Sequence, residues 1–111
     1  GSDNFNSAAG AGLKAWVNFN GTSTVDIRAA YNVSSISDTG TGNYIVNFTT
    51  AMSDTNYARC VTVGGNATTT GSQALSPYNA TPTTASLNIV TFTTSFSAVQ
   101  DCNEVNVSIF R

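Results

Sequence analysis

Apolar side chains recur at every second residue in this chain, which is the spacing of β-strands with one covered face. The alternation runs through residues 15–20, 25–34, 44–48, 57–63 and 105–110. No segment keeps apolar residues at the three-and-four spacing of an amphipathic helix. We therefore predict an all-β fold, an antiparallel β-sandwich built from short strands.

Two segments have the composition of connections between strands. Residues 37–42 contain Asp38, Gly40 and Gly42, which favour a turn. Residues 64–84 are rich in Gly, Thr, Asn and Pro, and we expect them to form a projecting surface loop. Between Leu87 and Phe96 the apolar parity changes, which predicts a β-bulge or a strand that changes sheets.

Length and charge limit the classes of protein to which this chain can belong. The 111 residues suffice for one domain, and we expect residues 1–12 to be a tag remnant and flexible linker and residues 13–111 a single sandwich. Only 9% of the residues are charged, and the four basic residues are scattered, so nucleic acid is not an expected partner. No apolar run reaches the roughly 18 residues of a membrane span, so membrane insertion is not expected.

The chain has few residues of the types that carry out catalysis. The chain has no His, which excludes a Ser/His triad and a His-ligated metal, and two Cys alone make a poor zinc site, so we expect no metal or cofactor. Carboxylates could supply a glycosidase pair, but most fall where Asp caps its own turn. We therefore expect a protein that is not an enzyme. The carboxylates considered are Asp26, Asp38, Asp54, Asp101 and Glu104.

The single Trp lies on the polar side of its predicted strand, together with Asn18 and Asn20. If residues 20–24 form the next loop, Trp16 lies opposite Arg28 and Asn18 opposite Asp26, which would stack the guanidinium on the indole. Such a group could be a platform for a sugar or an interface between subunits.

The long predicted loop carries one aromatic residue among neutral polar groups. Tyr78 lies near Asn66, Gln73 and Asn79, whose amides both donate and accept hydrogen bonds. These residues suit the neutral hydroxyls of a glycan, and Tyr and Asn are favoured in adaptable binding loops. The alternative is an inert, solvated loop with Tyr78 folded onto the sheet.

Three ordered motifs between Lys14 and Met52 read KAWVNFNGT, YNVSSI and NYIVNFTTAM, and the chain ends in VNVSIFR. With them, about a third of the chain resembles the carboxyl-terminal domain of bacteriophage tail fibres. The resemblance implies a receptor-binding tip that forms a homotrimer and attaches a virion to a glycan or outer-membrane protein of the bacterial surface. It also implies a location on the virion, acting outside the cell.

The resemblance bears on the open choices. Because the family is trimeric, it favours the subunit interface over the sugar platform for Trp16 and its neighbours. For Cys60 and Cys102, assembly in a reducing cytosol favours free thiols and work outside the cell permits a disulfide. Two rival functions remain: a structural trimerisation or decoration module without receptor contact, and a glycan hydrolase.

Overall fold

The computed structural model describes residues 12–64, 73–75, 82–92 and 98–111, and the predicted linker therefore lies outside the described residues except for Gly12. The described residues form eight strands and no helix, so they contain no helix that could cross a membrane. The strands are β1 (Leu13–Asn20), β2 (Asp26–Tyr31), β3 (Val33–Gly40), β4 (Asn43–Phe48), β5 (Ala58–Val63), β6 (Gln73–Leu75), β7 (Ser86–Phe92) and β8 (Val105–Phe110).

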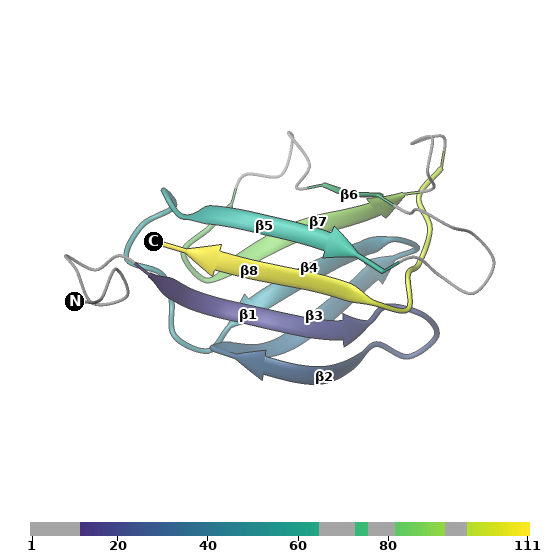
Figure 1. The fold of residues 1–111 in the computed structure, drawn as a ribbon, viewed down its shortest axis with the longest axis horizontal. Coiled ribbons are helices and arrows are strands. Elements are labelled where there is room, and N and C mark those ends of the chain that lie inside the picture. The colour runs from purple at the N-terminus through teal and green to yellow at the C-terminus, as the bar shows by residue number, and fades with distance from the viewer. Residues whose placement is uncertain (1–11, 65–72, 76–81, 93–97) are drawn as a thin grey trace.

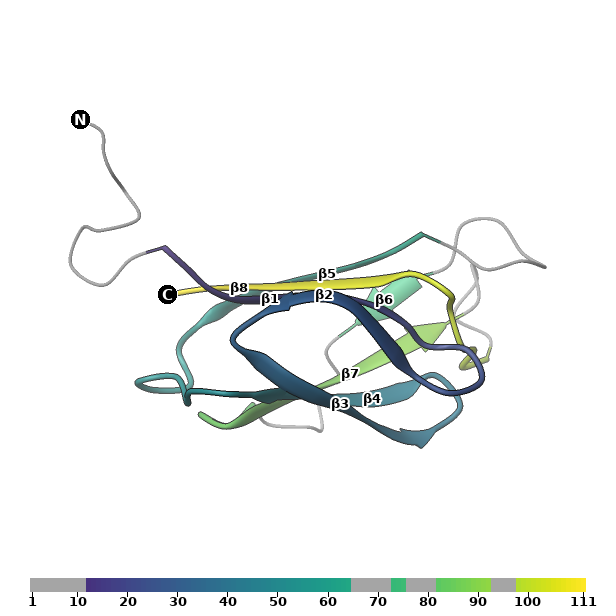
Figure 2. The same ribbon diagram turned by 90° about the horizontal axis from the view of Figure 1, so that it is seen from below.

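Two antiparallel sheets pack face to face (Figures 1 and 2). Sheet A has the strand order β2-β1-β8-β5, and sheet B has the order β3-β4-β7-β6. This arrangement confirms the predicted antiparallel β-sandwich. The start of β1 and the end of β8 lie at the same end of the sandwich, where Leu13 pairs with Phe110 (Figure 1).

The core lies between the two sheets and follows the alternation of the sequence. On β1, Ala15, Val17 and Phe19 are buried, and they pair across the sheet with buried residues of β8. From sheet B, Tyr44 meets Phe19 edge to face, with ring centroids 5.3 Å apart. Burial of these apolar side chains is the main stabilising term of the fold. The other large buried residues of the core are Val46, Phe48, Met52, Tyr57, Leu87, Ile89, Val90, Val105, Val107 and Ile109.

The prediction of one strand over residues 25–34 is wrong, because the chain changes sheets inside that segment. β2 ends at Tyr31 in sheet A, and β3 begins at Val33 in sheet B. Asn32 between them has a φ of 57°, a left-handed conformation that Asn tolerates better than most residues. Apolar residues recur at every second position from Val25 to Val33, across the change, so periodicity could not reveal it.

The predicted connections also need correction. β3 continues to Gly40, so the turn before β4 is confined to Thr41 and Gly42. The predicted loop over residues 64–84 contains β6, the edge strand of sheet B. β7 pairs in regular register with β4 from Ser86 to Val90 and with β6 from Val90 to Phe92, so the predicted irregularity is absent as far as Phe92.

Candidate functional site

The outer face of sheet A, which points away from the core, carries Trp16. Its neighbours in the sheet are Tyr31 on β2 and Ser108 on β8, and Cys60 on β5 continues the row. Trp16 is half-buried, whereas Tyr31 is 55% exposed. Two aromatic side chains therefore stand next to each other on an outward-facing surface.

The predicted register between β1 and β2 is wrong. Trp16 pairs with Tyr31 rather than Arg28, and Asn18 pairs with Ala29 rather than Asp26. Two features shift the register. The connection begins and ends one residue later than predicted, so that Asn20 pairs with Asp26, and a β-bulge follows in which Arg28 is the extra residue of β2. The bulge turns Tyr31, which the alternation had placed on the core side, to the outer face beside Trp16.

Arg28 begins a chain of polar contacts across this face. Its Nη1 donates to Asn18 Oδ1 over 3.4 Å, and Asn18 Nδ2 donates to Asn106 Oδ1 over 2.5 Å. Asn106 Nδ2 then donates to Glu104 Oε2 over 3.3 Å. We call these four residues the amide ladder. Asp26 lies outside it, as the partner of Asn20 at the end of the two strands.

The ladder orients its two amide side chains but does not use all of their hydrogen-bonding groups. An Asn side chain has two N–H donors and two acceptor lone pairs, and the ladder uses one of each on Asn18 and on Asn106. Each amide keeps one donor and one acceptor for a ligand. A second contact holds Arg28 in place, because its Nη2 donates to the backbone carbonyl of Asn103.

The other part of the same face is apolar. Leu13 and Phe110 are cross-strand partners near the chain ends, and they are 38% and 42% exposed. The outer face of sheet A therefore has an aromatic row at Trp16 and Tyr31, with the polar ladder on one side and exposed apolar residues on the other.

At the end of the sandwich where β1 begins and β8 ends, a cleft of about 650 Å³ opens beside Tyr31. We call it the end cleft. Asn32 frames it, because its Nδ2 donates to the carbonyls of Lys14 and Thr50, each over 3.0 Å, and its Oδ1 accepts from the Thr50 N–H. The cleft is lined by Lys14, Tyr31, Asn32, Thr49, Thr50, Ala51, Met52, Ser53 and Arg111.

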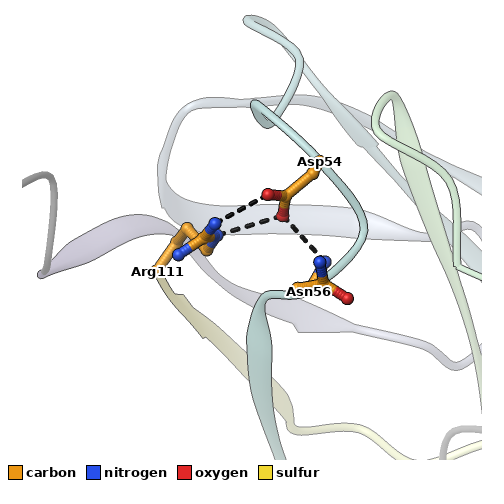
Figure 3. Close-up of polar contacts among 3 residues, drawn as sticks. All are labelled: Asp54, Asn56 and Arg111. Atoms are coloured by element: carbon orange, nitrogen blue, oxygen red, sulfur yellow. Dashed lines mark hydrogen bonds and ion pairs between the residues drawn. The ribbon is translucent and has the colours of Figure 1, made fainter.

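Arg111 is held at the cleft by a two-point ion pair with Asp54 (Figure 3). Its Nε donates to Asp54 Oδ1 over 3.0 Å, and its Nη2 donates to Oδ2 over 2.6 Å. Asp54 Oδ1 also accepts from the backbone N–H of Asn56. The Arg111 guanidinium, with help from that N–H, holds the pKa of the Asp54 carboxyl below its usual value.

Gln73 is the only one of the four residues named in the predicted binding loop that the structure describes. Asn66, Tyr78 and Asn79 lie outside the described residues, and Gln73 begins β6, where its backbone pairs with Phe92. The loop therefore stays a prediction, apart from the strand within it.

The two cysteines are both free. Cys60 is exposed on the outer face of β5, whereas Cys102 is fully buried. A side chain on the outside of a sheet cannot meet one inside the sandwich, so the disulfide that the sequence permitted does not form in this structure.

Several carboxylates have structural contacts. Asp38 and Asp54 each accept from the backbone N–H two residues later, which confirms their predicted role as turn caps. Asp101 accepts from the N–H of Gly42 and from the phenol of Tyr44. Within the described ranges, no three metal-binding side chains of the His, Cys, Asp or Glu type come together.

Sequence reasoning missed Tyr31, Lys14 and Arg111 as members of one surface. A signal for Tyr31 was available, since Asn32 is a residue type that tolerates a left-handed turn and could end the strand there.

Comparison with known proteins identifies no relative, because no family model, no curated protein and no solved structure matches the chain.

Proposed function

We propose that this domain is the receptor-binding head of a bacteriophage tail fibre and that it attaches to a glycan on the bacterial surface through the outer face of sheet A. The observation that carries the proposal is the pairing of Trp16 with Tyr31 beside the amide ladder. The resemblance of residues 14–52 to tail-fibre domains supports the biological setting.

The chemistry of this face suits a neutral saccharide. Aromatic rings cover the apolar faces of sugar rings, and the spare donor and acceptor on each ladder amide can bond hydroxyl groups. Binding sites of this kind combine aromatic side chains with a few oriented polar groups. If the domain is a homotrimer, three weak sites engage together, and avidity exceeds single-site affinity by about two to four orders of magnitude.

The test is the Trp16→Ala variant, compared with wild type for adhesion to bacterial cells and for molar mass by light scattering. We expect adhesion to fall at least about tenfold with an unchanged mass, as for a buried aromatic anchor. Val99→Ala is a control, because Val99 is an exposed apolar residue outside this face. Undiminished adhesion of the Trp16 variant would refute the proposal.

A second candidate function is a structural trimerisation module, in which the same face packs against neighbouring subunits. The exposed apolar pair of Leu13 and Phe110, next to Trp16, favours this candidate. It predicts that Phe110→Ser and Trp16→Ala both lower the molar mass, and that purified wild-type domain neither adheres to cells nor blocks infection.

A further inference from the structure

Some of the polar side chains that line the end cleft already bond to the protein, and the others do not. Asn32 and Arg111 are committed to protein contacts. In contrast, the side chains of Lys14, Tyr31, Thr49, Thr50 and Ser53 form no hydrogen bond or ion pair in the described part of the chain. One ammonium and four hydroxyls are therefore available to a ligand.

The cleft also concentrates positive charge in an acidic protein. The whole chain has four Lys and Arg residues and a net charge of −2, yet two of those four residues line this cleft and no Asp or Glu does. Asp54 neutralises Arg111 from beside the cleft, so the uncompensated charge is that of Lys14. The local field favours an anion.

We propose that the end cleft binds an acidic sugar of the uronic acid class. The Lys14 ammonium takes the carboxylate in a charge-assisted hydrogen bond, and the hydroxyls of Thr49, Thr50 and Ser53 bond the sugar hydroxyls. The ring of Tyr31, where the cleft meets the outer face of sheet A, packs against the sugar ring. A cleft of about 650 Å³ lies within the usual size range of small-ligand sites.

This site goes beyond the proposed function, which depends on Trp16, Tyr31 and the amide ladder; the two sites share only Tyr31. The hydroxyl lining favours a sugar over a bare anion, because hydroxyls both donate to and accept from sugar hydroxyls, whereas phosphate mainly accepts and has no ring for Tyr31 to cover. Comparing glucuronate with inorganic phosphate therefore distinguishes a site for a carboxylate sugar from a general anion site.

The experiment is an NMR titration of the isotopically labelled 111-residue chain with glucuronate, glucose or inorganic phosphate at low ionic strength. We expect glucuronate to shift the amide signals of Tyr31 and residues 49–53 and to bind at least about fivefold more tightly than the other two ligands. Lys14→Gln should weaken glucuronate binding about tenfold. Lys14→Arg, which keeps the charge, should restore part of the affinity.

The matched control is Arg59→Gln, which changes the net charge equally at an exposed residue that does not line the cleft. It should leave the affinity within about twofold, because Arg59 does not line the cleft and two charges separated by water interact only weakly. Should Lys14→Gln fail to fold, Thr50→Val removes one lining hydroxyl and should also weaken glucuronate binding.

Three results would each overturn the proposal: no shift at the cleft, equal affinity for glucose or phosphate, or an equal loss in the Arg59 variant. Trp16→Ala should leave this titration unchanged, so failure of the end cleft and failure of the proposed function are told apart.

Discussion

The phenol of Tyr44, on β4 of sheet B, donates a hydrogen bond to the backbone carbonyl of Gly21, just beyond β1 of sheet A, over 2.8 Å. Its single proton is shared with Asp101 Oδ1, at 2.9 Å, and that oxygen also accepts from the Gly42 N–H. The Gly21 N–H donates to the carbonyl of Cys102. Tyr44 therefore ties the two sheets together at the end opposite the end cleft.

Replacing Gly21 by Ala should destabilise the fold through a steric clash. The new methyl group would lie 2.7 Å from Tyr44 Cζ and 2.9 Å from the carbonyl oxygen of Cys102, and the phenol oxygen would be closer still. Overpacking of this kind costs about 1–3 kcal/mol, which urea unfolding measures.

The matched comparison is the same Gly21→Ala change in a Tyr44→Phe background. Removing the phenol oxygen removes the closest contact, so the cost should fall by at least about 0.5 kcal/mol. Additive costs would show that the clash lies elsewhere.

Alkaline pH should destabilise the protein through Tyr44. Burial, reinforced by the hydrogen bond and charge of Asp101, raises the pKa of Tyr44 above its ordinary value of 10.0. Above about pH 10 the unfolded chain releases this proton and the folded protein keeps it, so stability falls by about 1.4 kcal/mol per pH unit.

The Tyr44→Phe variant should lose this part of the alkaline slope. Burial also raises the pKa of Tyr57, which contributes equally to both proteins and cancels in the comparison. Urea unfolding between about pH 9 and pH 11 measures the two slopes. Parallel slopes would mean that Tyr44 ionises as easily in the folded state as in the unfolded one.

Local periodicity predicted the strands well wherever the strand stayed in one sheet. In residues 15–19, 44–48 and 105–109 the apolar residues at every second position, which begin at Ala15, Tyr44 and Val105, are buried. The same rule failed after Arg28, because one bulged residue exchanges the two faces of every position that follows it in the strand. A bulge depends on pairing with β1, and hydropathy along β2 does not record that pairing.

The end cleft lay beyond sequence reasoning for a different cause. Lys14, Thr50 and Arg111 come from three distant parts of the chain, and the pairing of β1 with β8 and the side-chain bonds of Asn32 bring them together. The carboxylate beside the cleft, Asp54, was considered as a glycosidase carboxylate and as a turn cap, and the structure shows the turn cap.

Asn32 should be important where the chain crosses between the sheets. Asn32→Ala removes three side-chain hydrogen bonds and leaves a left-handed φ of 57° that Ala disfavours, so we expect a loss of about 2–3 kcal/mol in urea unfolding. Asn32→Gly loses the same bonds but tolerates the backbone, and it should cost about 1 kcal/mol less. A glycine variant as unstable as the alanine variant would show that φ contributes nothing.

Acidic pH should weaken the link between Asp54 and Arg111. The pKa of Asp54 is lowered by its bonds to Arg111 and to the Asn56 N–H, so its contribution to stability is present above the ordinary value of 3.8. It is lost as the pH falls through the lowered pKa of the folded protein. Below about pH 4, the midpoint temperature of thermal unfolding should therefore decrease less steeply with falling pH in Asp54→Asn than in wild type.

Arg111→Gln is the partner control for the acid experiment. It removes the main cause of the lowered pKa, and its pH profile should approach that of Asp54→Asn. A wild-type profile in either variant would mean that the ion pair does not form in solution.

Asp54→Asn should also change the end cleft, because Asp54 supplies the only counter-charge of Arg111 among the described residues. The amide keeps the backbone contact geometry but leaves the guanidinium uncompensated beside Lys14. We expect glucuronate affinity to rise about two- to fivefold at low ionic strength, the size of one partly exposed charge interaction. The gain should vanish near 1 M salt, where the screening length is about 3 Å. An affinity unchanged at low salt would place Arg111 outside the field that the ligand feels and would leave Lys14 as the cleft's sole attraction for a carboxylate.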